Sequence, residues 1–459
     1  MKSLFLILSF LFTTTIISAQ NDTKFSKAEV LEDLAYLYAS LQATHHNLYA
    51  YTSKEEFDEA YAEVASSIIQ DSLTLLEATN TLQRLSSLAR NGHTGVLYPI
   101  QSYSDYVYAG GTVFPLEIAF ADGKPLVRKN WSSNTNITPG AELMSINGKP
   151  IAEVLARIYP QISAERRYFA NVMLEVFTLP RYYWQVFGEE KNFEVELRSN
   201  NEIQQYQIEA VSALEGFEMK RTDVLNAQMK LTFFEQTAYL NPGDLSGDES
   251  VYQAFIDSAF MEIKQSEPSN LIIDLRNNGG GDNSFGDYLV SYIANQPFYW
   301  TSNFTLKSSD LLKADIRESR DTTTAFWQSA LTHESGEVYE YAFEAYQPQA
   351  VEKRFTGKVY VLVNRQSHSQ SAVTAAQIQD YGFGTIAGEE TGDYPSLHAS
   401  IFHYSLPNTG IPVKVSKGYI VRVNGSTKEE GVIPDIVIKD YLLDEEDEIL
   451  EGLLDRLAQ

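Results

Sequence analysis

The chain of 459 residues contains no cysteine. This absence excludes disulfide bonds, thiolate zinc sites, a cysteine nucleophile and a lipid anchor carried on an N-terminal cysteine. Basic residues are also scarce, because 35 Lys and Arg stand against 61 Asp and Glu, which gives a formal net charge of -26. Such a charge repels phosphate backbones, and no Lys/Arg cluster overrides it locally. We therefore expect no nucleic-acid partner.

Long apolar runs are missing as well, except near the start of the chain. Residues 1–19 begin with a lysine at position 2, continue with about a dozen apolar residues, and end in small residues, as secretory signal peptides do. A membrane anchor is the alternative, but this run is too short to cross a bilayer and no later run is long enough. We expect cleavage after Ala19, export to the periplasm or the exterior, and no membrane span. The oligomeric state stays open.

Hydrophobic residues make up 44% of the chain, which is sufficient for packed cores, and the length favours several domains. Apolar residues at helical spacing predict an N-terminal helical domain over 24–98. Alternating strands broken by glycine turn signals predict a β-rich domain over 108–215. Within it, "ITPGAELMSINGKPIAEVLARI" (137–158) resembles the latter half of a PDZ domain. A plain β-rich spacer is the alternative interpretation.

The remainder of the chain has a different pattern. Over 225–440, continuous apolar runs alternate with helical ones, which predicts strands buried on both faces within a helix-covered sheet. Residues 305–350 are polar and charged, and we expect a surface excursion or a lid there. The tail, 441–459, is predicted to be an acidic helix. The fold class expected from these patterns is a multidomain combination of α+β and α/β parts.

Two short stretches carry candidate chemistry. "DLRNNGGGDNS" (274–284) leaves a buried strand through three glycines, so its backbone N–H groups can point into a cleft and form an oxyanion hole. Packing alone is the alternative, and no lysine follows as a phosphate-binding loop would require. "NRQSHSQSAVTAAQIQDYG" (364–382) places three serines at a helix N-terminus, where the dipole stabilises developing negative charge. A serine at this position can also be a simple helix cap.

Together these stretches, with "QDYGFGTIAGEETG" and "GVIPDI", resemble the C-terminal processing, or tail-specific, serine peptidases and their tricorn-core relatives. The resemblance implies an α/β peptidase core with a buried mixed sheet of the ClpP/crotonase-like kind. It also implies peptide or protein substrates and no cofactor. Ser369 falls on the nucleophile of that family. Gln370 would then donate one oxyanion N–H, and Gly279 or Gly280 the other.

The base expected from this resemblance is a histidine. Bacterial processing proteases use a lysine further along the chain, but this sequence reads Gly392-Asp393-Tyr394-Pro395 at that point. The tricorn-like branch uses a histidine in a Gly-His-Thr turn instead, and His93 matches it. A glutamate before the final Gly-Val-x-Pro-Asp segment would orient that imidazole. The candidates for it are Glu429 and Glu430, with Glu390 as a competitor and surface carboxylates as the alternative.

The resulting hypothesis is an exported serine-type peptidase with a Ser nucleophile, a His general base and a backbone oxyanion hole. No histidine pair has convincing metal spacing, so we expect no metal. The alternative is a catalytically inactive protein of peptidase fold that binds peptides or lipids, suggested by the missing lysine. A glycan hydrolase with paired carboxylates has only export and an acidic surface in its favour.

Overall fold

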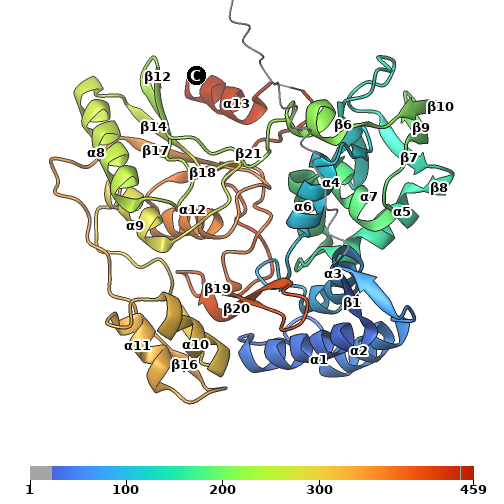
Figure 1. The fold of residues 1–459 in the computed structure, drawn as a ribbon. Helices are drawn as coiled ribbons and strands as arrows, with labels where there is room; N and C mark the ends of the chain where they lie inside the picture. Colours follow the sequence, from blue (N-terminus) through green and yellow to red (C-terminus); the bar gives the residue numbers. More distant parts are fainter. Residues whose placement is uncertain (1–22, 445, 459) are drawn as a thin grey trace, which may run out of the picture.

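The structure, a computed structural model, describes residues 23–444 and 446–458. The predicted signal segment, 1–19, therefore lies outside the described residues. Figure 1 shows three groups of elements: helices of the N-terminal part in blue, a β-rich part in teal and green, and an α/β part from yellow-green to red. The α/β part and the β-rich part lie side by side, and the helices of residues 27–86 lie below the β-rich part.

The N-terminal part is built on amphipathic helices with strong start signals. Ser26 with Glu29, and Ser53 with Glu56, form the predicted capping boxes, in which each serine and glutamate satisfy one another's backbone amide. The stripe predicted on the first helix, which includes Leu34, is fully buried. The elements are β1 (Lys24–Ser26), α1 (Lys27–Thr44), α2 (Lys54–Ser67), β2 (Ser72–Thr74), α3 (Leu75–Ser86), η1 (Ser87–Ala89), β3 (Gly95–Val96) and α4 (Ile100–Tyr108).

The β-rich part is an antiparallel sheet in the order β10-β9-β7-β6-β5, with β8 paired to β7. Helices α5, α6 and α7 pack on it around a common apolar core. The segment 137–158 forms a strand, a tight turn, a second strand and a helix. The elements are β4 (Thr112–Val113), β5 (Leu116–Ala121), β6 (Lys124–Asn130), β7 (Glu142–Ile146), β8 (Lys149–Pro150), α5 (Ile151–Ile158), η2 (Tyr159–Gln161), α6 (Arg167–Phe177), α7 (Leu179–Phe187), β9 (Asn192–Ser199), β10 (Glu202–Glu209), β11 (Val211–Ser212) and η3 (Ala213–Glu218).

The α/β part contains a mixed sheet in the order β12-β13-β14-β17-β18-β21, in which β12 is antiparallel to β13 and the other pairings are parallel. Both faces are covered, because Leu271 and Ile273 belong to one core and Ile272 to another. Because its side chains are buried on both faces of the sheet, β14 has a continuous rather than an alternating apolar run. The elements are β12 (Lys230–Phe234), β13 (Thr237–Asn241), α8 (Glu249–Ser266), β14 (Asn270–Asp274), α9 (Asn283–Ser291), β17 (Lys358–Val363), α12 (Gln370–Tyr381), β18 (Thr385–Gly388), β21 (Ile436–Val437) and α13 (Glu448–Leu457).

The acidic tail helix α13 is more than a solvated surface. Its Ile449 and Leu453 are fully buried and pack against the sheet residues Ile272, Leu362 and Ala387. The helix therefore covers the second face of the mixed sheet of the α/β part, while Glu451, Asp455 and Arg456 are exposed.

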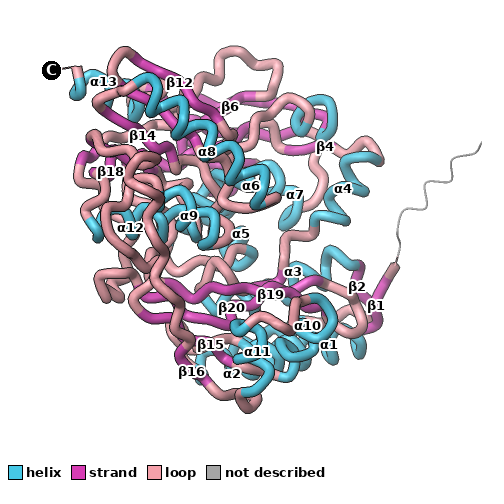
Figure 2. The backbone as a smooth tube through the Cα atoms, turned by 90° about the vertical axis from the view of Figure 1, so that its left-hand side faces the viewer, coloured by secondary structure: helices cyan, strands magenta, loops and turns pink. Residues whose placement is uncertain are grey.

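A second antiparallel sheet, in the order β16-β15-β20-β19, joins the parts, because β3 of the N-terminal part pairs with β20. Figure 2 shows β19 and β20 crossing the molecule above α1, α10 and α11. The excursion 305–350 contributes to this region and buries apolar side chains such as Leu312 and Ile316. The elements are β15 (Asn303–Lys307), α10 (Asp310–Ser319), α11 (Ala325–Thr332), β16 (Val338–Glu340), β19 (Leu397–Ser405) and β20 (Pro412–Val421).

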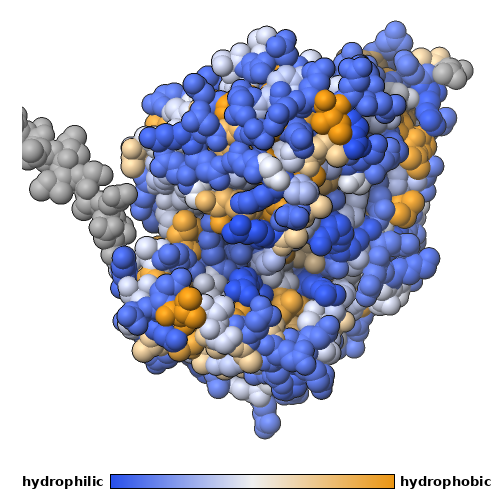
Figure 3. All heavy atoms as spheres, turned by 90° about the vertical axis from the view of Figure 1, so that its right-hand side faces the viewer, coloured by the Kyte–Doolittle hydropathy of each residue, from blue (hydrophilic) through white to orange (hydrophobic). Residues whose placement is uncertain are grey.

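The surface agrees with the composition. Figure 3 shows a face that is mainly hydrophilic, with apolar residues in small separate patches. Among the helices of the described residues, none combines the length and the apolar character that a membrane crossing requires.

Candidate active site

Ser369 lies at the junction between the loop after β17 and the start of α12. Its backbone has φ 48° and ψ -123°, a conformation that non-glycine residues rarely adopt and that only a strongly determined environment maintains. Its hydroxyl caps no backbone amide of the described helix, so the capping alternative does not describe this serine. Instead, Ser369 Oγ lies 3.1 Å from His93 Nε2. The structure thus brings together two candidates from distant parts of the chain.

The glycine loop and the serine loop are joined by a dense set of hydrogen bonds around Asn278. The backbone N–H of His368 donates to Asn278 O at 3.0 Å, and Ser371 Oγ donates to Asn278 Oδ1 at 2.6 Å. A second asparagine pair, Asn277 and Asn364, exchanges hydrogen bonds in both directions. Because these groups are largely buried, each satisfied bond fixes the relative position of the two loops.

The N–H groups of the three predicted oxyanion donors differ in the partners that they already have. Within the described residues, the Gln370 N–H makes no backbone or side-chain hydrogen bond. It belongs to the first residue of α12. The Gly279 N–H interacts with the Asp244 carboxylate, an interaction that opposes the rise in the pKa of Asp244 caused by burial. The Gly280 N–H donates to Asn278 Oδ1 at 2.9 Å. In this arrangement Gln370 offers a free donor, Asp244 competes for the Gly279 N–H, and the Gly280 N–H is committed to the loop itself.

His93 is held in the tight turn Asn91–Thr94, which is closed by a bond from Thr94 N to Asn91 O at 2.9 Å. Lys414 of β20 donates from Nζ to Gly92 O at 2.6 Å, and Glu165 Oε1 accepts from Gly92 N at 3.0 Å. The turn is therefore anchored to both the second sheet and the β-rich part.

Burial governs the ionisation of this centre. It lowers the pKa of His93 to about 3, and the nearby Lys414 charge lowers it further in the same direction. Burial also raises the pKa of Glu165, with Asp393 adding to the effect, and raises the pKa of Asp393. The pKa of Lys414 is lowered by burial. At neutral pH the imidazole is therefore uncharged and able to accept a proton.

Asp393 connects directly to the serine. Its Oδ2 accepts the Ser369 N–H at 2.9 Å and lies 3.9 Å from His93 Nε2. One oxygen each of Asp393 and Glu165 and one ring nitrogen of His93 lie within 4.8 Å of one another, which is the only cluster of metal-ligand type found within the described residues. The ammonium of Lys414 interacts with both carboxylates, so positive charge is already supplied there without a metal.

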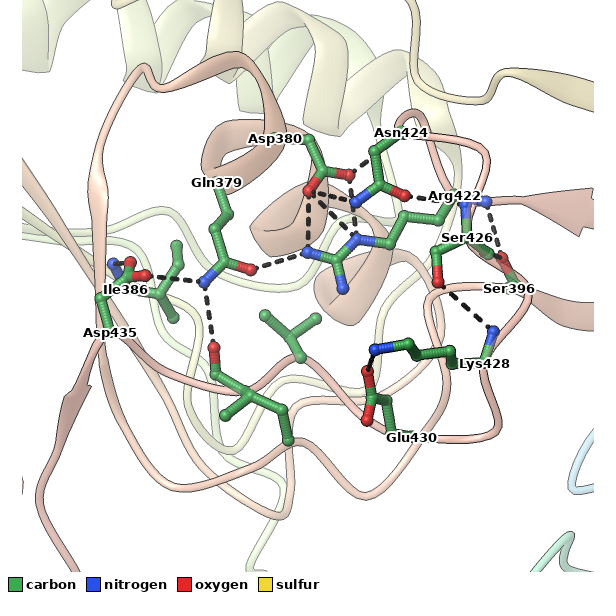
Figure 4. A network of polar contacts seen from close by, with 12 residues as sticks. Gln379, Asp380, Ile386, Ser396, Arg422, Asn424, Ser426, Lys428, Glu430 and Asp435 are labelled. Carbon is green, nitrogen blue, oxygen red and sulfur yellow. Dashed lines mark hydrogen bonds and ion pairs between the residues drawn. The ribbon is translucent and has the colours of Figure 1, made fainter.

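The predicted orienting glutamates lie elsewhere. Glu430 pairs with Lys428 at 3.5 Å on the surface, in the network drawn in Figure 4, and Glu429 is exposed. The competitor Glu390 pairs with Arg166 at 2.7 Å and accepts the Gly431 N–H at 2.9 Å. None of these three carboxylates has a contact with His93 among the described residues.

Ser369 opens into a cleft of about 910 Å³. The excursion 305–350 and the strand before it supply an aromatic wall, and the glycine loop and β20 supply polar groups. The aromatic residues of this wall are Trp300, Phe304, Phe326, Trp327 and Phe343.

Three groups at this centre, Glu165, Asp393 and Lys414, were not identified as site residues from the sequence. Glu165 and Asp393 lie in loops that read as surface, and only their burial distinguishes them. Lys414 gave no signal either, because it lies at the polar position between Val413 and Val415 in the alternating strand "PVKVSKGYIV".

Comparisons with known proteins find a family match in the α/β part of the chain. Residues 230–438 match the model of peptidase family S41. A tail-specific protease of Haemophilus influenzae is 26% identical over 208 residues, which are 42% of this chain and 25% of that protein. The chain thus matches only about a quarter of that relative's length.

Solved structures extend the likeness in fold to nearly the whole chain. Mature CPAF in complex with lactacystin has a TM-score of 0.65 at 15% identity, and the match covers 94% of this chain and 97% of that one. Mature CPAF alone has a TM-score of 0.63 at 14% identity, covering 94% and 96%. The mixed sheet of the α/β part, both loop motifs and "GVIPDI" all lie within the residues that match the model of peptidase family S41.

Proposed function

We propose that this protein is an exported serine-type peptidase that cleaves peptide bonds. The observation that carries the proposal is the 3.1 Å approach of Ser369 Oγ to His93 Nε2, at a strained serine facing a large cleft. A nucleophile, an adjacent base and a free backbone donor are the minimum set for acyl transfer. The predicted leader at 1–19 supports export, and the match of residues 230–438 to peptidase family S41 supports peptide substrates.

The mechanism follows from these groups. Ser369 Oγ attacks the carbonyl carbon of the scissile bond while His93 Nε2 takes its proton. The oxyanion receives the Gln370 N–H and the positive end of the α12 dipole, and Gly279 adds a second donor once Asp244 turns away. His93 then gives the proton to the leaving amine, which leaves an ester on Ser369. A water molecule, deprotonated by His93, hydrolyses this ester and restores the hydroxyl.

A fluorophosphonate probe tests the proposal. We expect labelling of the wild-type protein at Ser369, loss of the label in Ser369→Ala and slower labelling in His93→Ala. Ser66→Ala, on the exposed face of α2, is a matched control that keeps the label. Labelling that persists in Ser369→Ala would refute the assignment of the nucleophile.

A digest of an unbiased peptide library separates catalysis from binding. Cleavage by the wild-type protein and none by Ser369→Ala supports the peptidase. Binding of peptides by both proteins, with no cleavage by either, supports the inactive binding protein instead. The role predicted from sequence for Glu429 and Glu430 stays a prediction, and alanine at each position tests it in the same assay.

A further inference from the structure

The turn that carries His93 is held by a segment of the β-rich part. Ser163 Oγ accepts from Asn91 N at 3.3 Å and donates to Asn91 O at 2.9 Å. Glu165 Oε1 accepts from Asn91 Nδ2 at 2.8 Å and from Gly92 N at 3.0 Å. Four hydrogen bonds therefore connect the loop between η2 and α6 to the two residues that precede His93.

The opposite side of the same turn is held by β20. Lys414 Nζ donates to Gly92 O, so Gly92 has a carboxylate on its N–H and an ammonium on its carbonyl. Hydrogen bonds with one charged partner are shorter and stronger than neutral ones. The ring of Phe169 closes the remaining space, because a Cβ on Gly92 would lie 2.5 Å from Phe169 Cε1. The turn has little freedom to shift or rotate.

Glu165 has a second oxygen that the turn does not use. Glu165 Oε2 and His93 Nδ1 are both buried and have no hydrogen-bond partner among the described residues. Both side chains belong to the cluster whose donor atoms lie within 4.8 Å of one another. A buried acceptor beside a ring that gains a proton during the reaction is placed to stabilise the imidazolium.

We propose that Glu165 is the positioning residue for His93: Oε1 fixes the Asn91–Gly92 backbone, and Oε2 receives the Nδ1–H of the imidazolium. This inference rests on the proposed function, in which His93 is the base. It assigns to the β-rich part a direct role in the chemistry. It also assigns the orientation of the His93 imidazole to a residue outside the segment 230–438 that matches the family model, rather than to Glu429 or Glu430.

The charges around Glu165 are consistent with this role. Lys414 interacts favourably with Glu165 and Asp393, so the centre contains one cation beside two acids. Burial disfavours ionisation of both acids, and each acid disfavours it in the other. When His93 becomes positive, ionisation of a carboxyl group within 4.8 Å of a ring nitrogen is favoured, so the stabilisation arises in the charged intermediate rather than in the resting state.

The test compares Glu165→Ala with Glu165→Gln. Glutamine keeps the side-chain oxygen that accepts from Asn91 and Gly92 but removes the second carboxylate oxygen. We expect kcat on a cleaved peptide to fall about 10²-fold in Glu165→Ala, since small misplacements of a reacting group have effects of this size. KM should change less than about threefold, because Glu165 contacts no part of the open cleft. The kcat of Glu165→Gln should be about tenfold higher than that of Glu165→Ala.

A second readout isolates the serine from substrate binding. The rate constant of fluorophosphonate labelling should fall in the same order, wild type above Glu165→Gln above Glu165→Ala. Glu153→Ala, an exposed glutamate on α5 of the same part, should match the wild type in both assays. If Glu165→Ala does not fold, as judged by its thermal transition, Glu165→Gln alone decides the question through its labelling rate.

Two results would overturn the inference and leave the proposed function intact. One is wild-type kcat and labelling in folded Glu165→Ala and Glu165→Gln. The other is a loss of kcat that follows Glu429→Ala or Glu430→Ala instead. By contrast, a wild-type protein that neither cleaves peptides nor labels at Ser369 would refute the proposed function itself.

Discussion

Gly280 lies directly against Ser369: a Cβ on this glycine would approach the Ser369 Cβ to 2.8 Å and both Gln370 N and His368 O to 2.7 Å. Its φ of +87° also belongs to the region that favours glycine. The close approach of the glycine loop is thus what maintains the strained serine and keeps the Gln370 donor beside it.

Gly280→Ala should therefore reduce activity strongly. The added methyl group must displace the serine loop, and a displacement of this kind is expected to lower kcat/KM by about 10²-fold or more. Gly279→Ala is the matched control, because its Cβ would meet only Leu225 Cδ1 at 3.7 Å, an ordinary contact. Peptide cleavage by the two variants measures the difference, and equal activities would contradict this account of the loop.

Removing the Asp244 carboxylate should increase activity. This carboxylate interacts with the Gly279 N–H, so it competes with an oxyanion for the second donor. One such donor contributes about 10²-fold to kcat, and we expect the kcat/KM of Asp244→Ala to be about threefold to tenfold above that of the wild type. Glu249→Ala, exposed at the start of α8, serves as the control. A decrease in Asp244→Ala would mean that Asp244 supports the loop rather than blocking it.

Activity should persist at pH values below the pKa of an exposed histidine. The base must be neutral, and burial lowers the pKa of His93 to about 3, so the active form persists as the pH falls past about 6.5. We expect kcat/KM at pH 6.0 to be close to its value at pH 7.5. A pH profile from 4.5 to 8, with circular dichroism at each pH, checks this. An inflection near or above pH 6.5 would point to another base.

A buried group of three histidines should make the fold sensitive to acid. His45 and His46 have ring centroids 5.4 and 5.3 Å from that of His398. Burial lowers the pKa of His45 and of His398 to about 3 and that of His46 to about 4. Because the unfolded chain binds protons that the folded chain does not, stability is present above about pH 6.5 and is lost as the pH falls.

The histidine prediction is measured by urea unfolding at pH 7.5 and pH 5.0. In His398→Gln, the loss of unfolding free energy between these two pH values should be smaller than in the wild type by about 2 kcal/mol. An identical loss in both proteins would show that this histidine does not govern the acid sensitivity.

A buried and an exposed ion pair in Figure 4 should differ in their effect on stability. Arg422 of the segment after β20 pairs with Asp380 of α12 at 2.8 Å, and their side chains are 12% and 8% exposed. Arg422→Met leaves a buried carboxylate unpaired and should cost about 3 to 5 kcal/mol. Lys428→Met breaks the pair with Glu430, whose side chains are 75% and 43% exposed, and should cost about 1 kcal/mol or less. Denaturant unfolding of both variants compares them.

Neighbouring residues along the chain set the local features of this protein. Strand β14 followed by three glycines, and β17 followed by a serine at a helix start, are set by neighbouring residues: apolar runs demand burial, and glycine permits unusual backbone. The capping boxes at Ser26 and Ser53 are equally local. For this reason the sequence alone is sufficient to predict Ser369 and His93 as site residues.

The charged groups that meet at that centre are brought together by long-range packing. Glu165, Asp393 and Lys414 come from three separate segments, and nothing in their neighbours distinguishes the two acids from surface carboxylates. Burial, and with it the shifted pKa values, exists only once the β-rich part, β20 and the serine loop are assembled. The same applies to Glu429 and Glu430, whose position beside "GVIPDI" gave no information on how far from His93 the folded chain would place them.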